Sequence, residues 1–408
     1  MNRRFLIVLT AEAISSLGSQ VTMVALPLTA VLILHADPLD MGLLSGISAL
    51  PAVIFGLFAG VLIDRWPKRR VLIIANAISA VVMLLVPLGH ALVFLSIPLL
   101  MLVRFIASTI SVGEGIGLNS TIPALVPPDA LADANGRFGA VMSVTALIGP
   151  AIAGLLIAAF SAPGAITADA ASFAVAVGLI ALLPHIPVPT VDHAAEGSVR
   201  DRLRAGFAFM RADPVMRPLM FVAIALNFFG SIFGALEALF IVGHLGVKPA
   251  WFGGALAASG IGAIAGALIS APVARRFDVM ATLTGAIVLF VISLGGISAL
   301  HGAPMLVAIG FGACNLIGGF GGAIVNVAIS THIQTATPEA MLARVMGVLI
   351  STFSATTPLG ALLGGLIAAG LGLRITLIGA TLGFFAVFVW LAFTARRRAA
   401  QPPIADHG

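Results

Sequence analysis

The chain has 408 residues, of which 60% are hydrophobic and only 9% carry a charge. A soluble globular protein carries about 25% charged residues, so this composition excludes that class and indicates an integral membrane protein. The net charge of +5 does not indicate nucleic-acid binding, because the basic residues lie in short stretches between long apolar runs. The single cysteine, Cys314, excludes an internal disulfide and a multi-thiolate metal site. No metal or cofactor is expected.

Twelve apolar runs are long enough to cross a bilayer as helices, which takes about 20 residues each. A membrane barrel would instead need strands of about 9–11 residues in which apolar and polar residues alternate. The first run is longer than the roughly 7–15 apolar residues of a signal peptide, so no cleavable signal peptide is expected. The sequence therefore predicts an all-α integral membrane protein with twelve transmembrane helices. The runs cover residues 5–34, 41–63, 71–94, 96–119, 138–160, 163–183, 218–242, 250–272, 280–300, 304–330, 345–370 and 375–394.

Basic residues in the turns set the orientation of these helices. Lys and Arg gather in the cytoplasmic loops of membrane proteins, and only Lys248 and Arg374 fall in turns on the other side. Both termini are therefore expected in the cytoplasm, with the chain in the cell (inner) membrane. The longest polar interval, from His185 to Arg217, has the arginine spacing of an amphipathic helix at the membrane surface. We divide the chain into an N-terminal half (1–183), a linker (184–217), a C-terminal half (218–394) and a tail (395–408).

The two halves repeat each other at an offset of 210 residues. Pro128 and Pro338 open similar segments, and Gly154 and Gly364 stand in similar Ala-x-x-Gly segments at the same offset. Parallel repeats of this kind are related by an axis along the membrane normal and hold a binding cavity between them. We therefore expect two pseudo-symmetric six-helix halves that superpose, with Gly154 over Gly364.

A basic turn joins the second and third apolar runs. It resembles the Gly-x-x-x-Asp-Arg-x-Gly-Arg-Lys pattern of the major facilitator superfamily, with Pro67 in place of the second glycine. The matching residues are Gly60, Asp64, Arg65, Lys68 and Arg69. In that family the aspartate pairs with the turn's own cations and with the N-terminal end of the eleventh helix in the outward-open state only. The resemblance implies a conformational latch, and a simple topology anchor is the alternative.

Two further patterns resemble the same superfamily. Gly149, Pro150 and Gly154 partly match the Gly-Pro-x-x-Gly-Gly motif of antiporters and exporters, although plain helix packing by small residues is the alternative. Arg104 takes the place of the arginine in the family's Arg-x-x-Gln-Gly motif, without its Gln and Gly. The resemblance covers the whole chain and is nearest to the branch with enterobactin exporters and macrolide efflux proteins. It implies the major facilitator fold and transport by alternating access.

Polar residues inside the apolar runs are the candidates for coupling or substrate binding, because a charge at the bilayer centre costs at least about 2.5–3.5 kcal/mol. A carboxyl group in a cavity can exchange a proton near neutral pH, as coupling to a proton gradient requires. For several of them a structural role, such as capping a helix end, is the alternative. The histidines all fall near run ends or in loops, where a solvated surface position is expected. The candidates are Glu12, Arg104, Glu114, Asp169, Asn227, Glu237 and Asn326.

The candidates are unevenly divided between the halves. At the offset of 210 residues Arg104 corresponds to Cys314 and Glu114 to Ile324, so chemistry that needs a charge is weighted towards the first half. Arg104 and Glu114 are ten residues apart, or about 15 Å along one helix, and cannot pair directly. We expect Glu114, in a cavity also reached by Glu12, to exchange a proton while Arg104 supplies a fixed positive charge.

These observations predict a proton-coupled exporter of amphipathic small molecules that acts as a monomer, with a small-molecule substrate, protons and membrane lipid as its partners. A proton-coupled nutrient importer of the same fold is the second possibility, because the motifs do not set the direction of transport. An intramembrane lipid-modifying enzyme is the third. It is disfavoured because no His shares an apolar run with a Ser or Asp in a usable pairing.

Overall fold

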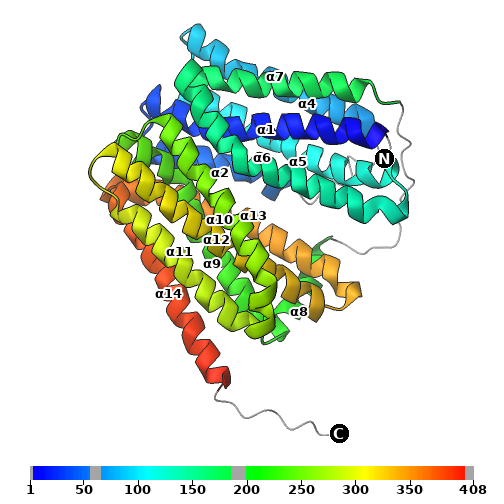
Figure 1. Ribbon diagram of the computed structural model, residues 1–408, viewed down its shortest axis with the longest axis vertical. Coiled ribbons are helices and arrows are strands. Elements are labelled where there is room, and N and C mark those ends of the chain that lie inside the picture. Colours follow the sequence, from blue (N-terminus) through cyan, green and yellow to red (C-terminus); the bar gives the residue numbers. More distant parts are fainter. Residues whose placement is uncertain (1–2, 56–65, 185–198, 400–408) are drawn as a thin grey trace.

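The computed structural model describes residues 3–55, 66–184 and 199–399 (Figure 1). These residues form helices joined by short turns, and twelve of the helices are long and apolar enough to cross a membrane. The prediction of an all-α protein with twelve membrane helices is confirmed. The elements are α1 (Arg3–Leu32), α2 (Pro38–Phe55), α4 (Lys68–Ala91), α5 (Ile97–Leu125), η1 (Pro128–Ala130), α6 (Leu131–Phe160), α7 (Ala162–Ala181), α8 (Val199–Ala212), α9 (Met216–Ala238), η2 (Leu239–His244), α10 (Pro249–Arg276), α11 (Val279–Ala299), α12 (Pro304–Ala336), α13 (Glu339–Leu371) and α14 (Leu373–Ala399).

Several helices extend past the apolar runs that predict them. The apolar run of the fifth span starts at residue 138, but α6 already begins at Leu131. Its first two turns are polar and contain an ion pair of 2.9 Å between Arg137 and Asp133, spaced i, i+4 on one face. Hydropathy detects only the part of a helix that suits hydrocarbon, so a polar helical extension at the membrane surface escapes it.

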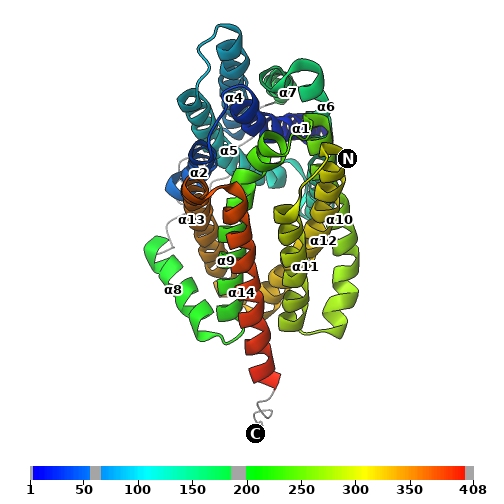
Figure 2. The ribbon, with the colours of Figure 1, turned by 90° about the vertical axis from the view of Figure 1, so that its left-hand side faces the viewer.

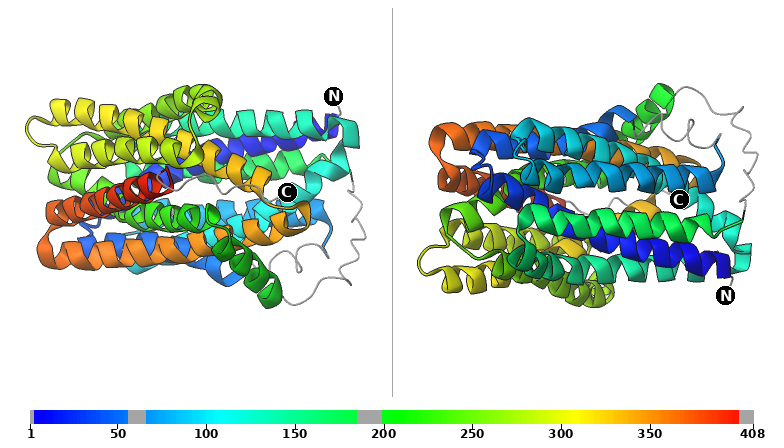
Figure 3. Two further views of the ribbon diagram at one scale, coloured as in Figure 1. Left: turned by 90° about the horizontal axis from the view of Figure 1, so that it is seen from below. Right: turned by 90° about the horizontal axis from the view of Figure 1, so that it is seen from above.

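The helices form two bundles, one in each half of the sequence. In the first bundle α1 packs against α6 and α7, and α4 packs against α5 and α7. In the second, α12 packs against α10 and α11, and α9 packs against α13 and α14. In Figure 3 the bundle of the C-terminal half lies in front in the left view, and the bundle of the N-terminal half lies in front in the right view. We call the end of each bundle at which the chain begins and finishes, near Arg3 and Ala399, the terminal end, and the other end the opposite end.

The two bundles meet at the opposite end and diverge towards the terminal end (Figure 1). One apolar cluster at the opposite end includes residues of both halves, such as Val24, Ile157, Ile232 and Phe311. Towards the terminal end the buried apolar residues form separate clusters, one in the second half and others in the first. Among the described residues, the hydrophobic effect therefore holds the halves together at the opposite end and not at the terminal end.

Glycines allow the closest contacts between the halves. A Cβ atom on Gly253 of α10 would lie 2.2 Å from the carbonyl oxygen of Pro150 and 2.9 Å from the Cα atom of Gly154, both on α6. A Cβ atom on Gly42 of α2 would lie 2.8 Å from the Cα atom of Gly365 on α13. Backbones approach this closely only where side chains are absent. The two contacts occupy corresponding places in the repeat to within one residue.

The linker between the halves contains the helix α8, which lies beside α13 in Figure 2. A Cβ atom on Gly206 would lie 2.6 Å from the carbonyl oxygen of Arg344, and Met210 is fully buried. The carboxylate of Asp213 then accepts hydrogen bonds from the backbone N–H groups of Val215 and Met216, at 2.7 and 2.8 Å. This arrangement attaches α8 to the second bundle at its terminal end.

Candidate functional site

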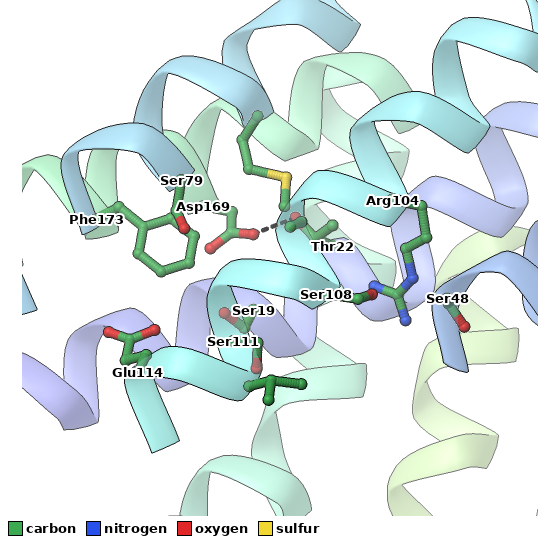
Figure 4. A pocket seen from close by; sticks show the side chains of 13 residues that line it. Ser19, Thr22, Ser48, Ser79, Arg104, Ser108, Ser111, Glu114, Asp169 and Phe173 are labelled. Atoms are coloured by element: carbon green, nitrogen blue, oxygen red, sulfur yellow. Dashed lines mark hydrogen bonds between the residues drawn. The ribbon is translucent and has the colours of Figure 1, made fainter. Parts of the chain in front are cut away.

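A polar cavity of about 310 Å³ lies inside the first bundle (Figure 4). Its walls come from α1, α2, α4, α5 and α7, and α5 supplies polar side chains at i, i+4 and i+7, the spacing of one helix face. Nine of its lining residues carry a polar side chain. They are Ser19, Thr22, Ser48, Ser79, Arg104, Ser108, Ser111, Glu114 and Asp169.

Arg104 is the basic residue of this cavity. Figure 4 shows its side chain extending towards Ser108 and Ser48. Among the described residues no hydrogen bond or ion pair holds its guanidinium, although the carboxylate of Asp169 attracts it across the cavity. An arginine that is not tied to one partner can bind an acidic group or stabilise a carboxylate that loses its proton.

Asp169 connects two helices beside the cavity. Its side chain is fully buried and accepts a hydrogen bond from the hydroxyl group of Thr22 on α1, and a longer one of 3.4 Å from Ser172. A Cβ atom on Gly18 would lie 2.7 Å from Oδ1 of Asp169, so the glycine lets α1 approach the carboxylate. Asp169 therefore does more than satisfy nearby backbone at a helix end, since it binds across a helix interface.

Glu114 lies at the other side of the cavity from Arg104 (Figure 4). Nδ2 of Asn76 donates a hydrogen bond of 2.6 Å to its Oε1 atom, and donates a second one to the carbonyl oxygen of Leu72. The charge of Glu114 acts on Glu12 of α1, which is partly buried and lies outside the cavity lining. The first bundle thus contains two carboxyl groups that line the cavity, Glu114 and Asp169, and a third, Glu12, beside it.

The second bundle has a cavity of similar size, about 310 Å³, with a different character. Asn227 and Asn326 both line it, with Phe290, Phe353 and Met346 among the apolar residues, and none of its described lining residues is charged. Asn227 accepts a hydrogen bond of 3.4 Å from the hydroxyl group of Thr357. The two asparagines are therefore brought together, but away from the charged candidates.

Glu237 stands apart from both cavities. It lies in the last turn of α9, two residues before the π-helical segment η2, and is partly buried. Gly230 and Gly234, at i−7 and i−3, share its face of the helix, and a Cβ atom on either would meet nothing within 4 Å. Glu237 thus continues an open face of α9 towards the end where the halves meet.

Only part of the basic turn can be placed. Gly60, Asp64 and Arg65 lie outside the described residues. Lys68 is 1% exposed at the start of α4, and Nη2 of Arg69 donates a hydrogen bond of 2.7 Å to the carbonyl oxygen of Ala181 at the end of α7. Arg69 therefore joins the terminal ends of α4 and α7 within the first bundle.

The glycine and proline motif of α6 lies where the halves meet. A Cβ atom on Gly154 would lie 2.8 Å from the carbonyl oxygen of Pro249 on α10, and the carbonyl group of Pro150 faces Gly253. Gly149 instead faces α1, because its Cβ atom would lie 2.3 Å from Cβ of Gln20. The motif thus lets α6 contact α1 with one face and α10 of the C-terminal half with another face.

The hydroxyl groups and the amide around the charged residues are functional candidates that the sequence alone does not single out. Asn76 binds Glu114 directly and Thr22 binds Asp169 directly, yet each is an isolated polar residue in a long apolar run. Ser108 and Ser111 could have been found from their spacing of four and seven residues after Arg104. One histidine also differs from expectation. His332 is a residue of α12, and its Nε2 atom is buried instead of solvated.

Known proteins match this chain along most of its length. The model of the Major Facilitator Superfamily matches residues 8–315 and 229–407. The multidrug efflux pump Tap of Mycolicibacterium fortuitum is 25% identical over 402 residues, which cover 96% of each chain. Macrolide efflux protein A of Enterococcus faecalis is 26% identical over 193 residues, covering 47% of this chain and 58% of that protein. The crystal structure of the nucleoside transporter NupG is similar in fold, with a TM-score of 0.74 at 17% identity, covering 98% of this chain and all of the other.

Proposed function

Because this chain belongs to the major facilitator superfamily of transporters, we propose that it exports amphipathic small molecules across the cell membrane in exchange for protons. The observation that carries the proposal is the polar cavity of the first bundle, which Arg104, Glu114 and Asp169 all line. Charged groups inside a membrane protein face a cavity or one another because hydrocarbon cannot solvate them. The efflux functions named for Tap and for macrolide efflux protein A support the direction of transport.

Alternating access follows from the way the halves meet. They pack at the opposite end and diverge towards the terminal end, which is the arrangement of a carrier open on one side. The excess of Lys and Arg near the terminal end supports a cytoplasmic position for this end and for both termini. A substrate would then enter from the cytoplasm, and rocking of the halves would expose it to the outside. We propose that one chain is sufficient for this cycle.

In this scheme the carboxyl groups of the first bundle exchange the proton. Glu114 lines the cavity and is held by Asn76, while Glu12 lies within electrostatic range of it. The positive charge of Arg104 makes a deprotonated carboxylate tolerable when the cavity is open to water. None of the described residues that line the cavity with Asn227 and Asn326 is charged, and this cavity contributes apolar surface instead. An apolar surface and a charged cavity together suit an amphipathic substrate.

The test is transport of a fluorescent dye by the purified protein in lipid vesicles with an imposed pH difference. Glu114→Gln keeps the size and hydrogen-bonding capacity of the side chain but cannot exchange a proton, so we expect dye binding to persist and uphill dye accumulation to be lost. Asp129→Asn, which neutralises an exposed carboxylate in the short turn η1 before α6, is the matched control and should transport normally. If Glu114→Gln still builds a dye gradient, coupling belongs to Glu12, Glu237 or Asp169. Accumulation in the direction of uptake would instead indicate an importer.

A further inference from the structure

A third cavity, of about 220 Å³, lies at the terminal end of the second bundle between α10, α11 and α12, whose packing is visible in Figure 2. It is separate from the two cavities discussed above and shares none of their lining residues. Drug-sized ligands occupy pockets of roughly 300–1,000 Å³. This smaller cavity therefore suits one end of a molecule.

Two buried polar atoms of this cavity have no hydrogen-bond partner among the described residues. They are Oγ1 of Thr282, whose side chain is 8% exposed, and Nε2 of His332. Both residues line the cavity. A buried polar atom without a partner is costly, and native proteins rarely contain one. Two such atoms facing one space indicate a ligand that hydrogen-bonds to both.

The other polar groups of the cavity are mainly hydrogen-bond acceptors. The hydroxyl group of Ser270 donates to the carbonyl oxygen of Gly266 at 2.7 Å, and that of Thr335 donates to Thr331 at 2.9 Å, so each hydroxyl oxygen retains only lone pairs for a ligand. The carboxylate of Asp278 accepts one bond, from the N–H group of Ala281, and keeps Oδ2 for another. A ligand that satisfies this set must carry several N–H or O–H donors.

The charge around the cavity favours a cation. The helices α10 and α12 both end here, at Arg276 and Ala336, and the C-terminal end of a helix carries a partial negative charge. Asp278 adds a full negative charge and offsets the positive start of α11. Arg275 and Arg276 are close in sequence, but they are exposed and do not line the cavity, so water and salt screen them.

We propose that this cavity binds the protonated amine end of an amphipathic molecule. The ammonium group donates to Asp278, Thr282 and His332, and the adjoining apolar part covers Phe277 and Ile324, two of the apolar residues in the lining. The ring of Phe277 offers a further favourable contact to a cation. The site goes beyond the proposed function, because it lies in the other half of the chain and its occupation requires no transport.

The test uses the purified full-length protein in detergent and three probes of similar shape: 2-phenylethylamine, which is protonated at neutral pH, the neutral 2-phenylethanol and the anionic 3-phenylpropanoate. We expect only the amine to bind and to raise the melting temperature. Asp278→Asn removes the charge while Asn still caps α11, and should weaken amine binding at least about tenfold. Thr282→Val should weaken it about fivefold. Thr284→Val is the matched control and should bind normally, because its hydroxyl group bonds to Met280 away from the cavity.

The melting temperature without ligand is a second readout. Thr282→Val replaces a hydroxyl group that has no partner with a methyl group of the same shape, so the variant should melt higher than the parent in the absence of amine. Equal binding of the three probes, tighter binding of the acid, or unchanged amine binding by Asp278→Asn would each overturn the proposal. So would a lower melting temperature of Thr282→Val, which would show that water satisfies the hydroxyl group. None of these results bears on the Glu114 test, which measures transport through the other half.

Discussion

The contact between Gly253 and α6 allows a direct test of the way the halves close. A methyl group added at Gly253 would lie 2.2 Å from the carbonyl oxygen of Pro150, whereas ordinary contacts begin at 3.4 Å. The halves would therefore have to separate here by about 1 Å. Overpacking of this kind costs typically 1–3 kcal/mol. In the proposed cycle only the state closed at the opposite end contains this contact, so Gly253→Ala should lower the population of that state relative to the other by about 5- to 150-fold.

The matched control is the neighbouring residue. A Cβ atom on Gly254 would meet nothing within 4 Å, so Gly254→Ala gains the same helix propensity, up to about 1 kcal/mol, without the clash. Spin labels at Gly136→Cys on α6 and Ala271→Cys on α10, in a chain with Cys314→Ala, report the separation of the terminal ends by pulsed electron resonance. We expect Gly253→Ala to gain a population with a shorter distance and Gly254→Ala to keep the parental distribution. Identical distributions for both variants and the parent would refute the reasoning.

Two other substitutions test single contacts. Asp64→Asn removes the charge that the family resemblance places against the start of the eleventh helix, an interaction worth up to about 2 kcal/mol. We expect the inward-facing population to rise. Normal transport with unchanged labelling by outside-reactive probes would instead identify the turn as a topology anchor. Thr22→Val removes the hydroxyl group that donates to the buried carboxylate of Asp169 and should lower the free energy of unfolding by about 1–3 kcal/mol. Ser143→Ala, which loses only an exposed bond within α6, is its control in denaturation measurements, and equal losses of stability would contradict the inter-helix role of Thr22.

The sequence by itself determined the class of protein and the number of spans. An apolar run in lipid can satisfy its backbone only within a helix, so twelve runs of sufficient length give twelve helices whatever their packing. The family also followed from local patterns, because motifs such as Gly149-Pro150 and the basic turn are contiguous in the chain. The charged candidates could be named as well, since a charge inside an apolar run is conspicuous without knowledge of its neighbours.

The tertiary structure decided which of those candidates meet. Hydropathy gives the depth of a residue but not the direction in which its side chain points, and direction depends on how each helix is rotated against its neighbours. Arg104, Glu114 and Asp169 share one cavity, whereas Glu237 and the two asparagines do not reach it. The partners of the carboxylates, Asn76 and Thr22, are 38 and 147 residues away in the chain. The buried atoms of Thr282 and His332 become evident only when α10, α11 and α12 enclose a space around them. Packing between helices distant in sequence creates these environments, and no local pattern encodes them.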